Sequence, residues 1–299
     1  MSRAVGVMAA EHIVAGVVEG SRVASPLCVF PEAGNDVDQL GLLPAHQITG
    51  AIADLVARVA AGHTVDAVGL GFPGVIRGGM VEESPNLQQA KGSDLRERLA
   101  EALAARSIAA PVHVINDADA VAAGIAAERG HLDKLIRVWT LGVGVGFGRY
   151  PQTDGMGEGG HMTVTLDPRE TYCGCGGVGH LEGIMGHRAM RLRFLDLEPE
   201  EIFAEAAEGD ARCREFVELW HRALAAATAT LVHVDGPGRF FVAGPNARFV
   251  RLDVLGQYVS DMVRMSPLRG SSFEIVAAED DVGVLGAAVS ALHAAGLEA

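Results

Sequence analysis

The chain has 299 residues, of which 49% are hydrophobic, 21% are charged and 5% are aromatic, and its net charge is −14. This composition predicts a folded globular protein of one large or two smaller domains, and it excludes a disordered chain, a collagen-like repeat and a disulfide scaffold. The negative charge argues against nucleic-acid binding, the lack of an apolar run of about 20 residues argues against a membrane span, and the four scattered cysteines favour a reducing, cytoplasmic compartment.

The first half of the chain alternates between apolar runs and Ala-rich stretches. In residues 45–61 the apolar positions recur every three or four residues, which predicts an amphipathic helix. Ser93 or Asp94 is a suitable N-cap for a second helix. We expect a strand hairpin at 4–10 and 13–18, further strands at 65–71 and 112–115, and helices at 45–61, 94–106 and 119–129.

The second half repeats this alternation after a glycine-rich strand. We expect strands at 136–141, 160–166, 240–243 and 273–277, and helices at 199–209, 210–234, 252–265 and 283–295. Strands that alternate with helices predict an α/β fold with largely parallel sheets. Because a hairpin-like glycine strand opens each half, the pattern also suggests two related domains.

A polar motif, Asn116-Asp117-Ala118-Asp119, follows the predicted strand at 112–115. The carboxyl ends of parallel strands are where such sheets bind ligands, so these side chains are candidates for a functional site. The alternative is structural, because Asn and Asp are also preferred helix N-caps. The residues alone leave both interpretations open.

A second motif combines two cysteines with two histidines, namely His161, Cys173, Cys175 and His180. Two thiolates and two imidazoles are sufficient to complete a tetrahedral zinc site, and the intervening glycines would let the backbone wrap around an ion. The alternative is a flexible glycine loop with two incidental cysteines.

Two turn motifs occur earlier in the chain, Gly71-Phe72-Pro73-Gly74 and Ser84-Pro85-Asn86-Leu87. Pro-Gly and Ser-Pro pairs mark turns. An asparagine held in a rigid turn is also suited to bind hydroxyl groups, because its amide both donates and accepts hydrogen bonds.

Taken in chain order, these segments resemble the ROK family (repressor, open reading frame, kinase). The segments that carry the resemblance are GFPGVIRGGMVEESPNL, VINDADAVAAG, GEGGHMTV, CGCGGVGHLE and DDVGVLGAAVSAL. The resemblance implies an α/β, two-domain actin/hexokinase-like (ribonuclease H-like) ATPase fold with a cleft between the domains. We therefore expect an N-terminal domain at 1–117, joined by a C-terminal helix at about 284–299, and a larger domain at 118–283 that carries the zinc-type loop.

The resemblance also implies a sugar kinase that uses ATP with Mg, binds zinc and forms a homodimer. Asp117 falls on the family's catalytic base, and His161 would bind zinc through one ring nitrogen and face the sugar with the other. His180 stands where the family has a third cysteine. The positions that match sugar-contacting residues are Asn86, Asn116, Asp117, Glu158, His161 and Glu182. The repressors of the family need an N-terminal DNA-binding domain, and because Met1 lies close to the first predicted strand we expect none here.

The chain departs from the family on the nucleotide side. Met8-Ala9-Ala10-Glu11-His12 stands where the kinases have Asp-x-Gly-Gly-Thr, Gly142-Val143-Gly144 replaces Gly-Thr-Gly, and Ala243-Gly244-Pro245 replaces Gly-Gly-Gly. The candidate nucleotide-binding residues are therefore Gly142, Gly144 and Gly244. Two functions remain open: a kinase with a weakened nucleotide site, and a non-catalytic protein that binds a sugar or a sugar phosphate.

Overall fold

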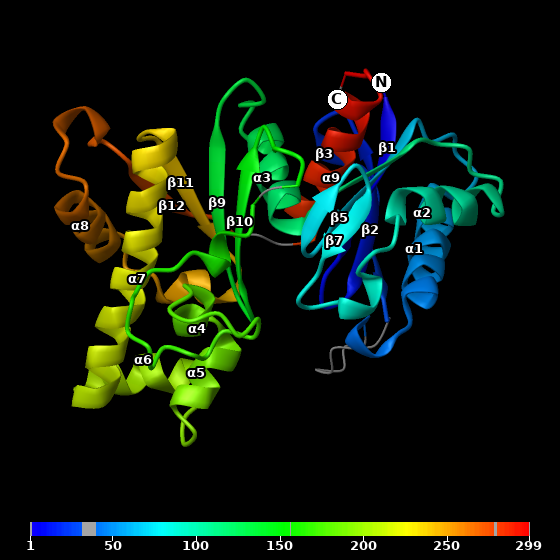
Figure 1. Cartoon of the computed structure of the whole chain (residues 1–299). Helices are drawn as coiled ribbons and strands as arrows, with labels where there is room; N and C mark the ends of the chain where they lie inside the picture. The colour runs from blue at the N-terminus through cyan, green and yellow to red at the C-terminus, as the bar shows by residue number, and fades with distance from the viewer. Residues whose placement is uncertain (1, 32–39, 156, 278–279, 299) are drawn as a thin grey trace. The chain divides into compact units, whose positions relative to one another are not determined.

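The computed structural model describes residues 2–31, 40–155, 157–277 and 280–298 (Figure 1). The chain forms two compact units, of which the first holds Met1–Arg137, Gly148–Gly157 and Ala278–Ala299, and the second holds Val138–Phe147 and Glu158–Ala277. The domain boundary expected after Asp117 stays a prediction, and the helix that begins there packs within the first unit.

A six-stranded sheet forms the centre of the first unit. Its strands run in the order β3-β2-β1-β5-β8, with β4 beside β2. They are β1 (Arg3–Ala9), β2 (Ile13–Glu19), β3 (Arg22–Val23), β4 (Cys28–Phe30), β5 (Ala67–Phe72) and β8 (Val112–Asn116). The predicted hairpin is confirmed, because β1 and β2 pair antiparallel, and β5 pairs parallel with both β1 and β8. A small antiparallel pair, β6 (Val75–Arg77) and β7 (Met80–Glu83), lies outside this sheet.

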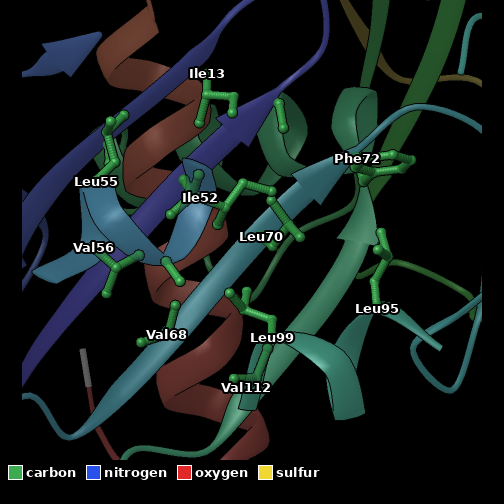
Figure 2. Packing of buried hydrophobic residues seen from close by; sticks show 14 of the residues in the cluster. Ile13, Ile52, Leu55, Val56, Val68, Leu70, Phe72, Leu95, Leu99 and Val112 are labelled. Atoms are coloured by element: carbon green, nitrogen blue, oxygen red, sulfur yellow. The ribbon is translucent and has the colours of Figure 1, made fainter. Parts of the chain in front are cut away.

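Helices cover both faces of this sheet. Helices α1 (Ala45–Ala60) and α2 (Leu95–Ala104) pack on one face, and α9 (Asp280–Ala294) packs on the other with α3 (Asp117–Glu128) beside it. Figure 2 shows the core under α1 and α2, where Ile52, Val56 and Leu99 meet Val68 and Leu70 of β5. Of the two caps predicted for α2, Asp94 is the one used, and its carboxylate accepts the N–H of Glu97 at 2.9 Å.

Helix α9 packs so closely on the sheet and on α3 that backbone atoms of the neighbouring elements are in contact. A Cβ on Gly69 of β5 would lie 1.9 Å from the carbonyl oxygen of Ala287, and a Cβ on Gly286 would lie 1.8 Å from the carbonyl oxygen of Ala120 in α3. Any other residue at these positions would therefore force the backbones apart. The position of α3 relative to the end of β8 depends on this contact.

The second unit is built on a sheet with the strand order β10-β9-β11-β12. These strands are β9 (Ile136–Leu141), β10 (Val145–Tyr150), β11 (Arg239–Ala243) and β12 (Ser272–Ile275), and β11 pairs parallel with β12. The helices are α4 (Glu182–Met185), α5 (His187–Arg193), α6 (Pro199–Glu208), α7 (Ala211–Asp235) and α8 (Leu252–Met262). Trp139, Trp220 and Phe240 are fully buried in the core that they enclose.

The strand predicted at 160–166 is wrong. Gly159–His161 forms a 3-10 turn, and Thr163 makes only an isolated bridge to His180. The backbone of this segment bonds instead to the loop that carries the two cysteines, with Val164 N–H donating to the carbonyl oxygen of Gly179 at 2.8 Å. The other predicted strands and helices are present, with ends that differ by a few residues. None of the helices in the described ranges has the length and apolar character that crossing a bilayer requires.

We expect Gly69→Ala to lower the free energy of unfolding by about 1–3 kcal/mol, because the added methyl group overpacks the contact with Ala287. Gly50→Ala in α1 is the matched control, because nothing lies within 4 Å of its Cβ position, and it should stabilise the helix by about 0.5–1 kcal/mol. Urea unfolding followed by circular dichroism measures both. Equal changes in the free energy of unfolding for the two substitutions would contradict the close packing of α9 against β5.

Candidate functional site

Asn116, the last residue of β8, forms hydrogen bonds to the first turn of α3 and to the Pro-Gly loop. Its side-chain oxygen accepts the N–H groups of Ala118 at 2.8 Å and Asp119 at 3.2 Å, so it is the N-cap of α3. Its amide nitrogen donates to the carbonyl oxygen of Gly74 at 3.0 Å. The structural alternative considered for the Asn-Asp-Ala-Asp motif is therefore confirmed for Asn116, which also holds the Pro-Gly loop against the start of α3.

Asp117 is the first residue of α3 and is half-buried. Burial raises the pKa of its carboxyl group above the usual value, and the N–H of Ala118, which Oδ1 accepts at 2.9 Å, opposes this effect. A carboxylate with a raised pKa accepts a proton more readily than an ordinary one. The raised pKa supports the role of general base that the resemblance implies for Asp117.

Asp119 has a different role from Asp117. Its side chain is buried, and Oδ1 accepts the N–H of Arg149 in β10 at 2.8 Å. Because a buried carboxylate is stable only with such partners, this contact accounts for an acidic residue at that position. Asp119 anchors the first turn of α3 to the strand beside it.

Asn86 lies on a segment that is fixed to the same Pro-Gly loop. Ser84 is fully buried, and its hydroxyl donates to the carbonyl oxygen of Pro73 at 2.8 Å and accepts the N–H of Leu87 at 3.3 Å. Gly74 has φ +112°, and a Cβ there would lie 2.1 Å from the carbonyl oxygen of Glu83, so only glycine fits this turn. The exposed Asn86 and the pair Asn116 and Asp117 are thus connected through one rigid loop.

The second unit brings together the four predicted metal ligands. One ligand atom from each of His161, Cys173, Cys175 and His180 lies within 4.8 Å of the others. The two sulfurs are 3.4 Å apart, Cys173 Sγ is 3.5 Å from His161 Nδ1, and Cys175 Sγ is 3.2 Å from His180 Nδ1. Zinc bonds of about 2.0–2.3 Å require ligand separations of about 3.5–3.8 Å at a tetrahedral site. The donor atoms fit a zinc ion after small shifts of the side chains, which lengthen the shortest separations and shorten the longest.

The chemistry of these residues supports a metal rather than a disulfide. All four cysteines of the chain are free thiols. Burial raises the pKa of the Cys173 thiol to about 12, so a metal ion has to displace its proton on binding. With Nδ1 of His161 directed at Cys173, its Nε2 lies 3.5 Å from a carboxylate oxygen of Glu158. His161 therefore links the metal cluster to a polar partner.

Glu182 begins α4 directly after the metal loop. One of its carboxylate oxygens accepts a hydrogen bond from the thiol of Cys173 at 3.7 Å, and the other accepts a hydrogen bond from the N–H of Val145 at 3.1 Å. Glu182 is therefore tied to the metal cluster on one side and to the turn between β9 and β10 on the other.

The three candidate nucleotide-binding glycines lie together in the second unit. Gly142 N–H donates to the carbonyl oxygen of Gly144 at 3.0 Å, which closes the turn between β9 and β10. Gly244 has φ +89°, and a Cβ there would lie 2.5 Å from the carbonyl oxygen of Leu141. The two glycine segments are thus in contact, although about 100 residues separate them in the sequence.

Two residues at this turn were missed by the sequence interpretation. Asn246 is fully buried, donates to the carbonyl oxygen of Gly142 at 3.3 Å, and lies 2.6 Å from Nε2 of His187. The available signal was an asparagine that directly follows a Gly-Pro pair.

The turn at residues 8–12, unlike the turn at residues 142–144, is filled by side chains. Met8 fills the space beside the sheet, because a Cβ on Gly71 would lie 2.5 Å from its sulfur and one on Gly283 would lie 2.8 Å from its Cγ. His12 Nε2 lies 3.2 Å from Asp280, and this hydrogen bond raises the pKa of His12. An apolar side chain and a histidine hydrogen-bonded to an aspartate thus occupy the turn where the resemblance leads one to expect an acid and a glycine pair.

Comparisons with known proteins identify the family. A model of the ROK family matches residues 34–294. The chain belongs to the ROK family. A glucokinase of Pyrobaculum calidifontis is 33% identical over 253 residues, which cover 79% of this chain and 82% of that protein.

Solved structures of ROK proteins confirm the actin/hexokinase-like fold. The ROK hexokinase from Thermus thermophilus has a TM-score of 0.78 at 24% identity, covering 98% of this chain and 99% of that one. The ROK glucokinase from Streptomyces griseus, in complex with glucose and AMPPNP, has a TM-score of 0.68 at 24% identity, covering 98% and 100%. A ROK transcriptional regulator, a homologue of the Escherichia coli MLC protein, has a TM-score of 0.72 at 18% identity, covering 98% and 79%. Because kinases and a regulator share this fold, function has to be argued from the site.

We expect one zinc ion per chain to copurify with the protein, held by His161, Cys173, Cys175 and His180. Cys173→Ser should release the ion and lower the melting temperature, because binding of a structural metal contributes directly to folding. Cys28→Ser is the matched control, because Cys28 lies on β4 of the first unit. Elemental analysis of protein prepared without chelator gives the zinc content of the wild type and of both variants, and thermal unfolding gives their melting temperatures. A wild type without zinc would disprove the site.

Proposed function

We propose that this protein is a sugar kinase that transfers a phosphoryl group from ATP–Mg to a hydroxyl of a hexose or hexose derivative. The observation that carries the proposal is Asp117, a half-buried carboxyl group with a raised pKa at the first turn of α3. The 33% identity to a glucokinase supports the same activity and makes glucose the first sugar to test.

In the proposed reaction, Asp117 accepts the proton of the sugar hydroxyl as its oxygen attacks the γ-phosphorus of the nucleotide. Phosphoryl transfer needs little covalent chemistry from the protein, so orienting the hydroxyl and taking up its proton are the main tasks of this residue. The bond between phosphorus and the β–γ bridging oxygen breaks as the new P–O bond forms. Magnesium neutralises the charge on the phosphate oxygens.

The sugar contacts that we propose come from two groups of residues. In the first unit, Asn86 is exposed, and Asn116 lies beside Asp117, with its side-chain amide hydrogen-bonded to the carbonyl oxygen of Gly74 and to the carboxylate of Asp117. In the second unit, Glu158, His161 and Glu182 adjoin the metal cluster. Groups that both donate and accept suit a polyol, because a polar site rejects ligands that leave its groups unpaired.

We assign zinc a structural role in this function. A zinc ion at the cluster would fix the ring of His161 and the loop before Glu182, and thereby the two side chains proposed to face the sugar. Two further parts of the proposal are a homodimer, which the family resemblance implies, and a cytoplasmic location, which the cysteine content favours.

One observation favours a second candidate function, a non-catalytic protein that binds a sugar or sugar phosphate. Met8 fills the position at which the family kinases have an acid, and Glu11 adds negative charge in the same turn. A like charge near anionic phosphates weakens their binding. The two candidates differ in whether bound sugar is phosphorylated.

We expect Asp117→Asn to lower the turnover rate by about 100- to 10,000-fold while it leaves the sugar dissociation constant nearly unchanged. An amide still forms a hydrogen bond to the hydroxyl, but it does not accept the proton. In the wild type, the rate should fall on the acidic side as Asp117 becomes protonated, at a pH above that of an ordinary aspartate because its pKa is raised.

Coupled ADP release with a panel of hexoses and amino sugars at millimolar ATP–Mg measures these rates, and calorimetry measures sugar binding. A wild type that binds a sugar but releases no ADP with it would overturn the kinase proposal and support the binding protein. Asp119→Asn is an informative comparison, because it changes a neighbouring carboxylate that bonds to Arg149 rather than one available as a base.

A further inference from the structure

The turn Gly142-Val143-Gly144 is held by hydrogen bonds from several parts of the second unit. Gly142 N–H bonds within the turn to Gly144, and Val145 N–H donates to the carboxylate of Glu182. The carbonyl oxygen of Gly142 accepts two further hydrogen bonds, from the N–H of His187 at 3.3 Å and from the amide of Asn246 at 3.3 Å. Both ends of the turn are therefore fixed.

Asn246 is the most constrained of these partners. Its side chain has 0% exposure, in a 3-10 turn (Pro245–Phe249) that follows Gly244. An amide buried in this way is stable only when its hydrogen bonds are made. The side-chain oxygen of Asn246 can only accept, so His187 has to donate to it from Nε2 at 2.6 Å. This contact therefore determines that Nε2 is the nitrogen of the His187 ring that carries a proton. His187 and Asn246 thus form a pair that bonds to the turn through both residues.

This anchoring leaves two neighbouring donors unused. Within the described part of the chain, the N–H groups of Val143 and Gly144 have no hydrogen-bond partner. Val143 is 53% exposed, so the tip of the turn is accessible to solvent. Successive backbone N–H groups in a turn form a concavity that binds anions such as phosphate.

We propose that His187 and Asn246 are positioning residues for the nucleotide in the kinase function proposed above. By holding the carbonyl oxygen of Gly142, the pair keeps the N–H groups of Val143 and Gly144 available to a phosphate of ATP. The pair acts on the backbone of the turn rather than on the nucleotide itself. The inference rests on the proposed function, because it assigns the turn to the phosphate donor.

The test compares Asn246→Ala, His187→Ala and His187→Gln with the wild type. Calorimetry with ATP–Mg alone and with glucose alone gives the two dissociation constants, and coupled ADP release gives KM for each substrate. We expect both alanine variants to weaken ATP–Mg binding about tenfold and to raise the KM for ATP, with less than a twofold change for the sugar. His187→Gln retains a side-chain N–H donor and should restore most of the affinity.

Thr228→Val is the matched control for loss of a buried hydrogen bond. The hydroxyl of Thr228 accepts the indole N–H of Trp139 at 3.1 Å in the same unit, so its removal should lower the melting temperature without changing the affinity for ATP–Mg. A nucleotide effect in this variant equal to that of Asn246→Ala would mean general destabilisation and would overturn the inference.

The remaining outcomes separate the inference from the proposed function. Folded alanine variants that bind ATP–Mg as the wild type does, in a protein that phosphorylates sugar, would overturn the positioning role and leave the kinase intact. Equal losses of affinity for sugar and for ATP–Mg in the alanine variants would also overturn the positioning role and leave the kinase proposal intact. A wild type that does not bind ATP–Mg at all would overturn both.

Discussion

The close approach of α9 to the sheet and to α3 is the contact on which the first unit depends. With glycine at positions 69 and 286, backbone atoms of neighbouring elements meet where a side chain would otherwise separate them. Helix α3 begins at Asp117, directly after β8 ends at Asn116, and the contact at Ala120 holds its first turns against α9. Asn116 then fixes the first turn of the helix, and Asp117 projects from it as the residue with the chemistry of a base.

In the second unit, Glu182 couples two sites that the sequence motifs suggest separately. Its two carboxylate oxygens bond to the thiol of Cys173 and to the N–H of Val145. Without a metal ion, Glu182 therefore links the metal loop to the turn between β9 and β10. A zinc ion would hold Cys173 as a thiolate, which no longer donates to Glu182, so zinc would act on Glu182 through the loop that it orders, while Glu182 keeps its hydrogen bond to Val145.

Much of this architecture was predictable because it depends on local patterns. The hairpin at the N-terminus, the helices and the Asp94 cap follow from apolar periodicity and capping preferences, and the Cys/His cluster follows from the spacing of its residues. The strand predicted at 160–166 failed because Met162, Val164 and Leu166 alternate like a strand, whereas Leu166 is 91% exposed and the backbone bonds to the metal loop. The Gly-Pro-Asn sequence drew attention to Asn246 at most, and its hydrogen bond to His187 was not predictable, because a contact between residues so far apart in the sequence leaves no local pattern.

The structure also separates two departures from the family that look alike in the sequence. At residues 8–12 the change is complete, because Met8 occupies the space and His12 is paired with Asp280. At residues 142–144 the backbone of the turn is anchored, two of its N–H groups are unused within the described residues, and the difference from the family's Gly-Thr-Gly motif is the hydroxyl missing at Val143. Loss of one hydrogen bond costs about 0.5–1.5 kcal/mol, or roughly a two- to twelvefold change in affinity. A donor site that lost one side-chain contact but kept its backbone donors is compatible with phosphoryl transfer at millimolar nucleotide, so the altered sequence at position 143 does not by itself argue for a protein without catalysis.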